Sequence, residues 1–184
     1  ITLNITINAS DLNGIQDLSA GFLVFNNLTI SLTKSSSLYN TSLYLPNLQA
    51  GFYNLTIIIS DSSSNTSLTI PIEILQLLTI SINQTTLDFG DIIPGNKSKP
   101  SSIEITNTGT ANTDIEISGS DLISSKSSIP VNSISLSAKN QQYILSQNPL
   151  QIPLNLAPSL KDNLIFTITP PIGNPASSYM GIIT

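Results

Sequence analysis

The sequence predicts an all-β fold arranged as two tandem β-sandwiches. Apolar and polar residues alternate over many short segments, as expected for strands that bury one face. No segment carries apolar residues at the i, i+3, i+4 and i+7 spacing of an amphipathic helix. Clusters of Gly, Pro, Asn and Ser separate the alternating segments about every 8–12 residues, which is the strand spacing of sandwiches.

The expected strands follow the alternation along the chain. They cover residues 1–8, 28–33, 53–59, 68–74, 78–82, 103–105, 115–117, 134–136, 152–156 and 164–168. Turn residues stand between them, for example Asn13-Gly14 and Ile93-Pro94-Gly95-Asn96. Pro71 and Pro153 lie inside strand patterns, and because proline cannot donate to a β-ladder, both indicate edge strands or bulges.

Composition excludes several classes of function. Only 9% of the residues are charged, and the chain contains no His and no Cys. Disulfides, thiolate metal sites and histidine catalysis are therefore absent, and we expect no enzyme, no cofactor and no metal site. A net charge of −5 with six scattered Lys argues against nucleic acid as a partner.

The chain begins at Ile1 without Met, which we interpret as the result of signal-peptide removal and therefore of secretion. No window of about 18 uninterrupted apolar residues predicts a membrane-spanning helix. The few carboxylates suit an acidic environment, since little charge is lost when they protonate, and low charge equally fits a neutral secreted protein. We expect the protein to be extracellular, at the cell surface.

Three segments are expected: an N-terminal strand at residues 1–8, a first sandwich at 9–77 and a second sandwich at 78–184. The first part has long alternating segments and many glycosylation sequons. The second part opens with the alternation at 78–82, and no flexible linker separates the two.

Sequons for N-glycosylation, Asn-x-Ser/Thr, are the clearest motif. They occur at Asn4, Asn8, Asn27, Asn40, Asn54, Asn65, Asn83 and Asn96, all within the first 98 residues. Composition alone would produce about five of them. Asn4, Asn27, Asn54 and Asn83 fall on the polar phase of expected strands, so their side chains should face solvent. The alternative is that these are ordinary polar residues of an Asn-rich chain.

Other motifs favour structural explanations. Ser31 and Lys34 match the S-x-x-K pattern of serine acyltransferases, but the partner motifs of those enzymes are missing and Ser31 falls on an expected strand. Asp88 and Asp91 flank a tight turn, and Asp11 lies in a fragment of a calcium-loop pattern without its full spacing.

The N-terminal segment allows two interpretations. Its eight residues alternate perfectly, and the weakly patterned residues 9–20 that follow provide no obvious hairpin partner. The segment is either the first strand of its own sandwich or a donor strand that completes the sheet of a neighbouring subunit.

Three runs in the second part resemble a known domain type: Leu87-Asp-Phe-Gly-Asp-Ile-Ile-Pro-Gly95, Ile103-Glu-Ile-Thr-Asn-Thr-Gly109 and Thr113-Asp-Ile-Glu-Ile117. They resemble the Ig-like domains of surface and scaffold proteins. The whole chain is similar to subunits of archaeal surface filaments, the "threads", in its sequons and tandem sandwiches. That resemblance implies two Ig-like domains and an N-terminal donated strand whose inserted side chains are Ile1, Leu3, Ile5 and Ile7.

The resulting hypothesis is a structural subunit of an N-glycosylated extracellular filament. Identical subunits would polymerise head to tail by inserting residues 1–8 into the next subunit, with possible contacts to other cells or surfaces. The alternative is an Ig-like binding or spacer module of a surface-layer protein or adhesin. A polysaccharide-acting enzyme is a third class, which would need an acidic cleft with aromatic platforms.

Overall fold

The computed structural model describes residues 2–12, 14–45 and 48–184, and it shows an all-β protein. One 3-10 turn, Val131–Ser133, is the only helical element among these residues. The chain divides into two compact units, Ile1–Leu77 and Leu78–Thr184. This division falls where the sequence analysis placed the boundary between the sandwiches.

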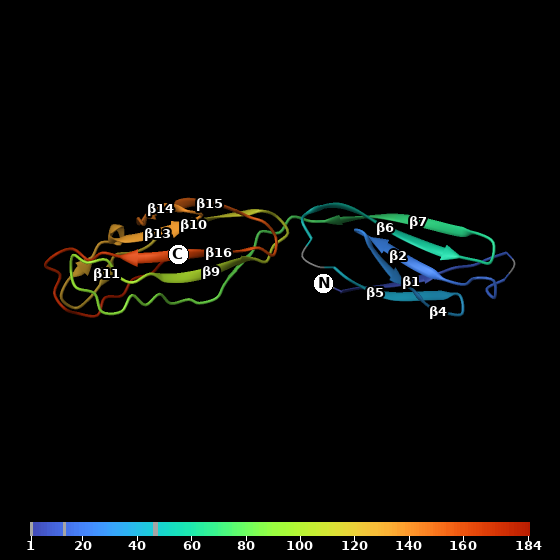
Figure 1. Ribbon diagram of the computed structural model, residues 1–184, viewed down its shortest axis with the longest axis horizontal. Helices are drawn as coiled ribbons and strands as arrows, with labels where there is room; N and C mark the ends of the chain where they lie inside the picture. Colours follow the sequence, from blue (N-terminus) through green and yellow to red (C-terminus); the bar gives the residue numbers. More distant parts are fainter. Residues whose placement is uncertain (1, 13, 46–47) are drawn as a thin grey trace. The chain divides into compact units, whose positions relative to one another are not determined.

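The first unit is a sandwich of two antiparallel sheets. Its strands are β1 (Thr2–Asn8), β2 (Gly21–Phe25), β3 (Leu28–Ser31), β4 (Thr33–Ser35), β5 (Leu38–Tyr44), β6 (Gly51–Ser60) and β7 (Asn65–Ile74). One sheet has the order β1-β5-β4 and the other the order β3-β2-β6-β7. Figure 1 shows β1, β4 and β5 on one side of this unit and β2, β6 and β7 on the other.

The core of the first unit lies between these two sheets. Its buried residues are Leu18, Leu23, Phe25, Leu32, Tyr39, Leu43, Leu55 and Ile57. Strand alternation explains the set, because Leu23 and Phe25 on β2 and Leu55 and Ile57 on β6 point to one face.

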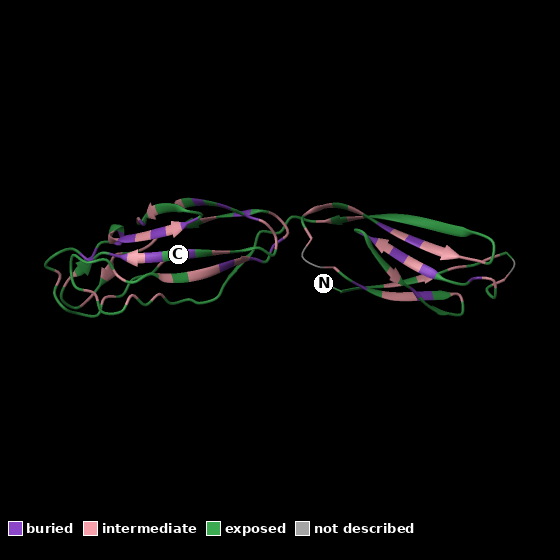
Figure 2. Cartoon of the chain, viewed as in Figure 1, coloured by how far each residue is buried: buried purple, intermediate pink, exposed green. Residues whose placement is uncertain are grey.

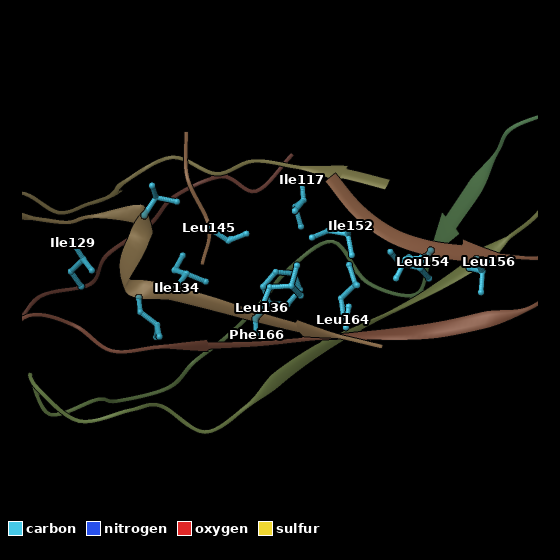
Figure 3. Packing of buried hydrophobic residues seen from close by; sticks show 14 residues of the cluster. Ile117, Ile129, Ile134, Leu136, Leu145, Ile152, Leu154, Leu156, Leu164 and Phe166 are labelled. Atoms are coloured by element: carbon cyan, nitrogen blue, oxygen red, sulfur yellow. The ribbon is translucent and has the colours of Figure 1, made fainter. Parts of the chain in front are cut away.

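The second unit is a larger sandwich. Its strands are β8 (Ile80–Ile82), β9 (Ser101–Asn107), β10 (Thr113–Ile117), β11 (Leu122–Ile123), β12 (Ser128–Ile129), β13 (Ile134–Ala138), β14 (Gln141–Ile144), β15 (Leu150–Leu156) and β16 (Lys161–Ile168). A five-stranded sheet of order β14-β13-β16-β9-β8 faces the pair β10-β15, and β11 pairs with β12. Figure 3 shows the apolar side chains of this core, with Leu136 and Phe166 fully buried among them.

The Asn-Thr-Gly motif after β9 has a structural role. Asn107 is completely buried, and its Nδ2 donates to the carbonyls of Ala111 and Leu156 at 2.7 and 2.6 Å. Its Oδ1 accepts the backbone N–H of Gly109 at 2.8 Å. One side chain thus closes the turn and ties it to β15, which explains the need for an amide at this position.

The prolines lie where the sequence predicted. Pro71 is on β7, the last strand of its sheet. Pro153 is on β15, which pairs only with β10 among the described strands, and the register of that pair shifts between Thr113 and Ile115. At both positions the strand has a neighbour on one side only among the described strands, so the missing proline N–H leaves no second neighbouring strand without a hydrogen-bond donor.

Candidate assembly site

The N-terminal strand pairs with β5 of its own chain. The two strands are antiparallel and in register from Thr2 opposite Tyr44 to Asn8 opposite Leu38. The sequence analysis did not identify this partner. In β5 the apolar residues Tyr39 and Leu43 are separated by polar residues, including the core-facing Thr41, so the strand lacks strict alternation.

The inner face of β1 packs on its own domain. Ile5 and Ile7 are half-buried against the core of the first unit. Leu3 is 36% exposed, and Ile1 lies outside the described residues. The expectation that residues 1–8 form an element separate from 9–77 is therefore corrected for the single chain, because β1 supplies an edge strand of the first sandwich.

The other edge of β1 has no partner strand among the described residues, and the sheet that β1 belongs to is narrower than the sheet it faces. β7 shows the consequence: Leu68 and Ile70 share the core-side face with Ile57 and Leu55 of β6, yet they are 58% and 41% exposed. Figure 2 shows β7 in the exposed colour, whereas its neighbour β6 has buried positions. The sandwich is therefore open beside β1.

The segment between β1 and β2 is held at a few points. Lys34 donates from Nζ to the carbonyl of Ile15 at 3.1 Å and also to that of Leu18. The Leu18 side chain is buried, and the Ser19 N–H donates to the carbonyl of Ser60 at 2.8 Å. Nearer to β1, the Ala9 N–H donates to the carbonyl of Ser37 at 2.9 Å. Between these two sets of contacts Gly14 has a φ of 103°, a conformation that suits glycine.

The predicted glycosylation sites lie at the surface. The Asn residues at positions 4, 8, 27, 54, 65, 83 and 96 are exposed, and Asn40 is half-buried. Asn4, Asn8 and Asn40 share the outer face of the β1–β5 pair. Two placements differ from expectation: Asn27 lies in the β2–β3 turn at φ 65°, and Asn83 follows β8 instead of lying within it.

The enzyme-like motifs have structural roles in the folded chain. Lys34 clamps the 9–20 segment, as described above. Asp88 Oδ1 accepts the N–H of Gly90 at 2.9 Å, and the carbonyl of Asp11 accepts the N–H of Gly14 at 3.2 Å, so both residues shape turns. Among the described residues, no three His, Cys, Asp or Glu side chains gather as a metal site would require.

The shifted pKa values also have local explanations. The N–H groups of Ser63 and Ser64 bond to Asp61 in the β6–β7 turn and lower the pKa of its carboxyl. Burial raises the pKa of the Tyr39 phenol, and a hydrogen bond to Ser127 lowers that of Tyr179. These groups belong to turns and packing contacts.

No protein-family model matches the chain, and no curated protein sequence matches it. Among solved structures it is similar to a chain of the CsuC–CsuE chaperone–tip adhesion subunit pre-assembly complex from the Csu pili of Acinetobacter baumannii. That alignment has 11% identity and a TM-score of 0.42, and covers 98% of this chain and 90% of the other. The secreted serine protease VesC from Vibrio cholerae aligns at 10% identity with a TM-score of 0.30, over 100% of this chain and 42% of VesC.

Both TM-scores lie below 0.5, so the all-β architecture rests on the strands and cores of the chain itself. Within the described part of the chain, no helix is long and apolar enough to cross a membrane.

Proposed function

We propose that the protein is a structural, non-enzymatic subunit of an N-glycosylated extracellular filament, assembled by exchange of β1 between identical subunits. In the filament, β1 of one copy lies against β5 of the next. The pairing of β1 with β5 carries this proposal, because it defines a slot that a seven-residue strand already fits over its whole length.

Exchange requires no new interface. A β1 strand from a second copy makes the same ladder hydrogen bonds and the same contacts of Ile5 and Ile7 as the chain's own strand. The contact is heterologous, since one subunit supplies the strand and the other the slot, so a geometry that does not close produces an open filament. The 12 residues between Asn8 and Gly21 reach about 40 Å when extended, which is enough for the strand to leave its own domain.

An empty slot is unfavourable for the acceptor. Without β1, Tyr39 and Leu43 of β5 lose their in-sheet neighbours Ile7 and Leu3, and the edge of β5 presents unpaired backbone groups. Release of the strand therefore exposes core residues of the first unit. This cost slows dissociation and makes each joint kinetically durable.

The sequons fit this arrangement. Asn4 and Asn8 lie on the face of β1 opposite to Ile5 and Ile7, so sugars there point to solvent while the apolar face enters the neighbour. A shift of one residue would bury both Asn side chains and expose the Ile side chains. Glycans on β1 would thus disfavour the wrong register.

One observation favours the second candidate function, an Ig-like spacer or binding module. In the single chain β1 pairs with β5 of the same chain, as expected of a module that stays monomeric. Such a module would show β1 paired within its own chain at every concentration.

Introducing a charge on β1 tests the proposal. Ile5→Asp should abolish filaments, since a carboxylate in an apolar slot costs several kcal/mol. Thr2→Asp is the matched control, because Thr2 is exposed on the outer face and its variant should still polymerise. Electron microscopy gives filament number and length. Filaments of normal length from Ile5→Asp, or from a chain lacking residues 1–8, would refute strand exchange.

A further inference from the structure

The eight sequons differ in what their third residue does in the folded chain. In four of them the Ser or Thr hydroxyl is hydrogen-bonded within the protein: Thr6, Ser42, Thr56 and Ser98, which belong to the sequons of Asn4, Asn40, Asn54 and Asn96. These hydroxyls are part of the acceptor that a glycosyltransferase must recognise. Half of the sequons are therefore structurally engaged.

Two of the engaged sequons bond to each other across the β1–β5 pair. Ser42 donates from its hydroxyl to Asn4 Oδ1 at 2.8 Å, and Thr6 donates to Asn40 Oδ1 at 2.8 Å. Each Asn thus accepts a hydrogen bond from the third residue of the other sequon, in line with the register of the strands. The bonds use the Oδ1 atoms and leave out both Nδ2 atoms, to which sugars are attached.

The other two engaged sequons are held in different ways. Thr56 and Thr69 share a hydroxyl–hydroxyl bond of 3.1 Å between β6 and β7. Ser98 Oγ accepts the N–H of Ile168 at 3.0 Å and donates to the carbonyl of Lys99 at 2.8 Å. The Ser98 N–H also donates to the carbonyl of Ile168 at 2.8 Å. Asn96 itself is outside any strand, so engagement is not merely a property of strand positions.

The remaining four sequons leave their third residue unengaged. Among the described hydrogen bonds, none involves the hydroxyls of Ser10, Thr29, Ser67 or Thr85. Their Asn residues lie at ends of strands or outside them: Asn8 ends β1, Asn27 is in a turn, Asn65 begins β7 and Asn83 follows β8. At Asn83 the side-chain Oδ1 accepts the N–H of Glu104 at 2.8 Å, which leaves Nδ2 out of the bond. The third residues Ser10, Thr29, Ser67 and Thr85 are all exposed, so their hydroxyls stay accessible after folding.

The modification is a group transfer from a lipid-phosphate-linked oligosaccharide. The bond between the anomeric carbon and the lipid phosphate oxygen breaks, and a bond between that carbon and Asn Nδ2 forms. Nδ2 loses one proton, and the lipid phosphate leaves as an anion. The transferase has to hold both the amide and the third-residue hydroxyl, so an engaged sequon must first detach from its partners.

From this geometry we infer that the sequons form two classes by order of modification. Asn4, Asn40, Asn54 and Asn96 accept sugar only before their strands or turns assemble, whereas Asn8, Asn27, Asn65 and Asn83 also accept it in the folded chain. The inference rests on the glycosylation in the proposed function and adds the order in which glycosylation and folding occur at each site. Glycans at Asn4 and Asn40 precede the β1–β5 pairing, so in a filament they are attached before the subunits join.

The test uses the full chain prepared without glycans. The folded protein is incubated with an oligosaccharyltransferase and its lipid-linked donor, and occupancy at each Asn is measured by glycopeptide mass spectrometry. We expect occupancy at Asn8, Asn27, Asn65 and Asn83 to exceed that at the engaged sites by more than about tenfold, because engaged sites react only from rare open states.

Two core variants serve as matched controls in the same assay. Leu43→Asp disrupts the first unit and should admit sugar at Asn4, Asn40 and Asn54 while Asn96 stays protected. Leu136→Asp disrupts the second unit and should admit sugar at Asn96 while Asn4, Asn40 and Asn54 stay protected. Equal occupancy of all eight sites in the folded wild type would overturn the inference, as would modification of none of them.

The native protein separates this inference from the proposed function. Native material carrying sugar on the engaged Asn residues supports glycosylation before folding. Native material with the bare 19.6 kDa mass contradicts the glycosylated filament itself. The order of modification is still decided by the assay on the folded chain.

Discussion

At the scale of single residues, some polar side chains stabilise the fold through hydrogen bonds that the apolar–polar alternation of the sequence does not predict. Asn107 satisfies two carbonyls and one N–H inside the second unit, and Lys34 holds the segment that follows β1. Buried polar atoms need such partners, because each lost hydrogen bond leaves a desolvated group. The Asn-Thr-Gly motif at Asn107 therefore stabilises a turn and joins it to β15.

Asn107→Leu should therefore destabilise the second unit strongly. The variant leaves two carbonyls and one N–H without their partner, and we expect a loss of about 2–5 kcal/mol in the free energy of unfolding. Asn112→Leu is the control, because Asn112 is exposed and its Nδ2 donates to Asn155 Oδ1 at 2.8 Å on the surface, and it should cost less than about 1 kcal/mol. Urea denaturation followed by circular dichroism measures both. Equal losses would contradict the role of Asn107.

At the scale of elements, strict alternation predicted the strands that have one buried face. The segments around residues 53–59, 134–136 and 164–168 lie in β6, β13 and β16. β5 escaped prediction because Asn40, Thr41 and Ser42 interrupt its apolar residues, so the partner of β1 could not be identified. Pairing over 29 intervening residues, from Asn8 to Leu38, leaves no local signal in the sequence.

The open side of the first sandwich leads to a prediction about two opposed residues. Ile57 on β6 and Leu68 on β7 lie opposite each other in the sheet and point to the same face, but their side chains are 5% and 58% exposed. In the unassembled chain, Ile57→Ala should cost about 2–5 kcal/mol of unfolding free energy and Leu68→Ala less than about 1 kcal/mol. Chemical denaturation of both variants checks this. Similar losses would mean that Leu68 is covered and the sandwich is closed.

At the scale of the whole molecule, two separate hydrophobic cores account for the two units, and the sequence predicted both the all-β class and the boundary near residue 77. Strand phase predicted the exposure of Asn4 and Asn54, whereas Asn27 and Asn83 are exposed but lie outside the strands expected to hold them. The position of β1 could not be predicted, since identical contacts arise within a chain or between copies. The central claim therefore concerns which copy supplies β1.

Mixing two single-cysteine chains tests this claim most directly. The protein has no Cys of its own, and Thr2 lies opposite Tyr44 on the exposed outer face; neither residue belongs to a sequon. Chains carrying Thr2→Cys are mixed with chains carrying Tyr44→Cys before assembly and then oxidised. Ser102→Cys and Ile165→Cys chains are the control pair, because β9 and β16 pair within the second unit and are not exchanged.

Strand exchange predicts a covalent dimer of the Thr2→Cys and Tyr44→Cys chains on non-reducing gels, lost on reduction, and none from the control mixture. A chain carrying both Thr2→Cys and Tyr44→Cys should then form covalent ladders. The account would be contradicted if the mixture stayed monomeric while the doubly substituted chain formed only an internal disulfide, since β1 would then pair with β5 of its own chain.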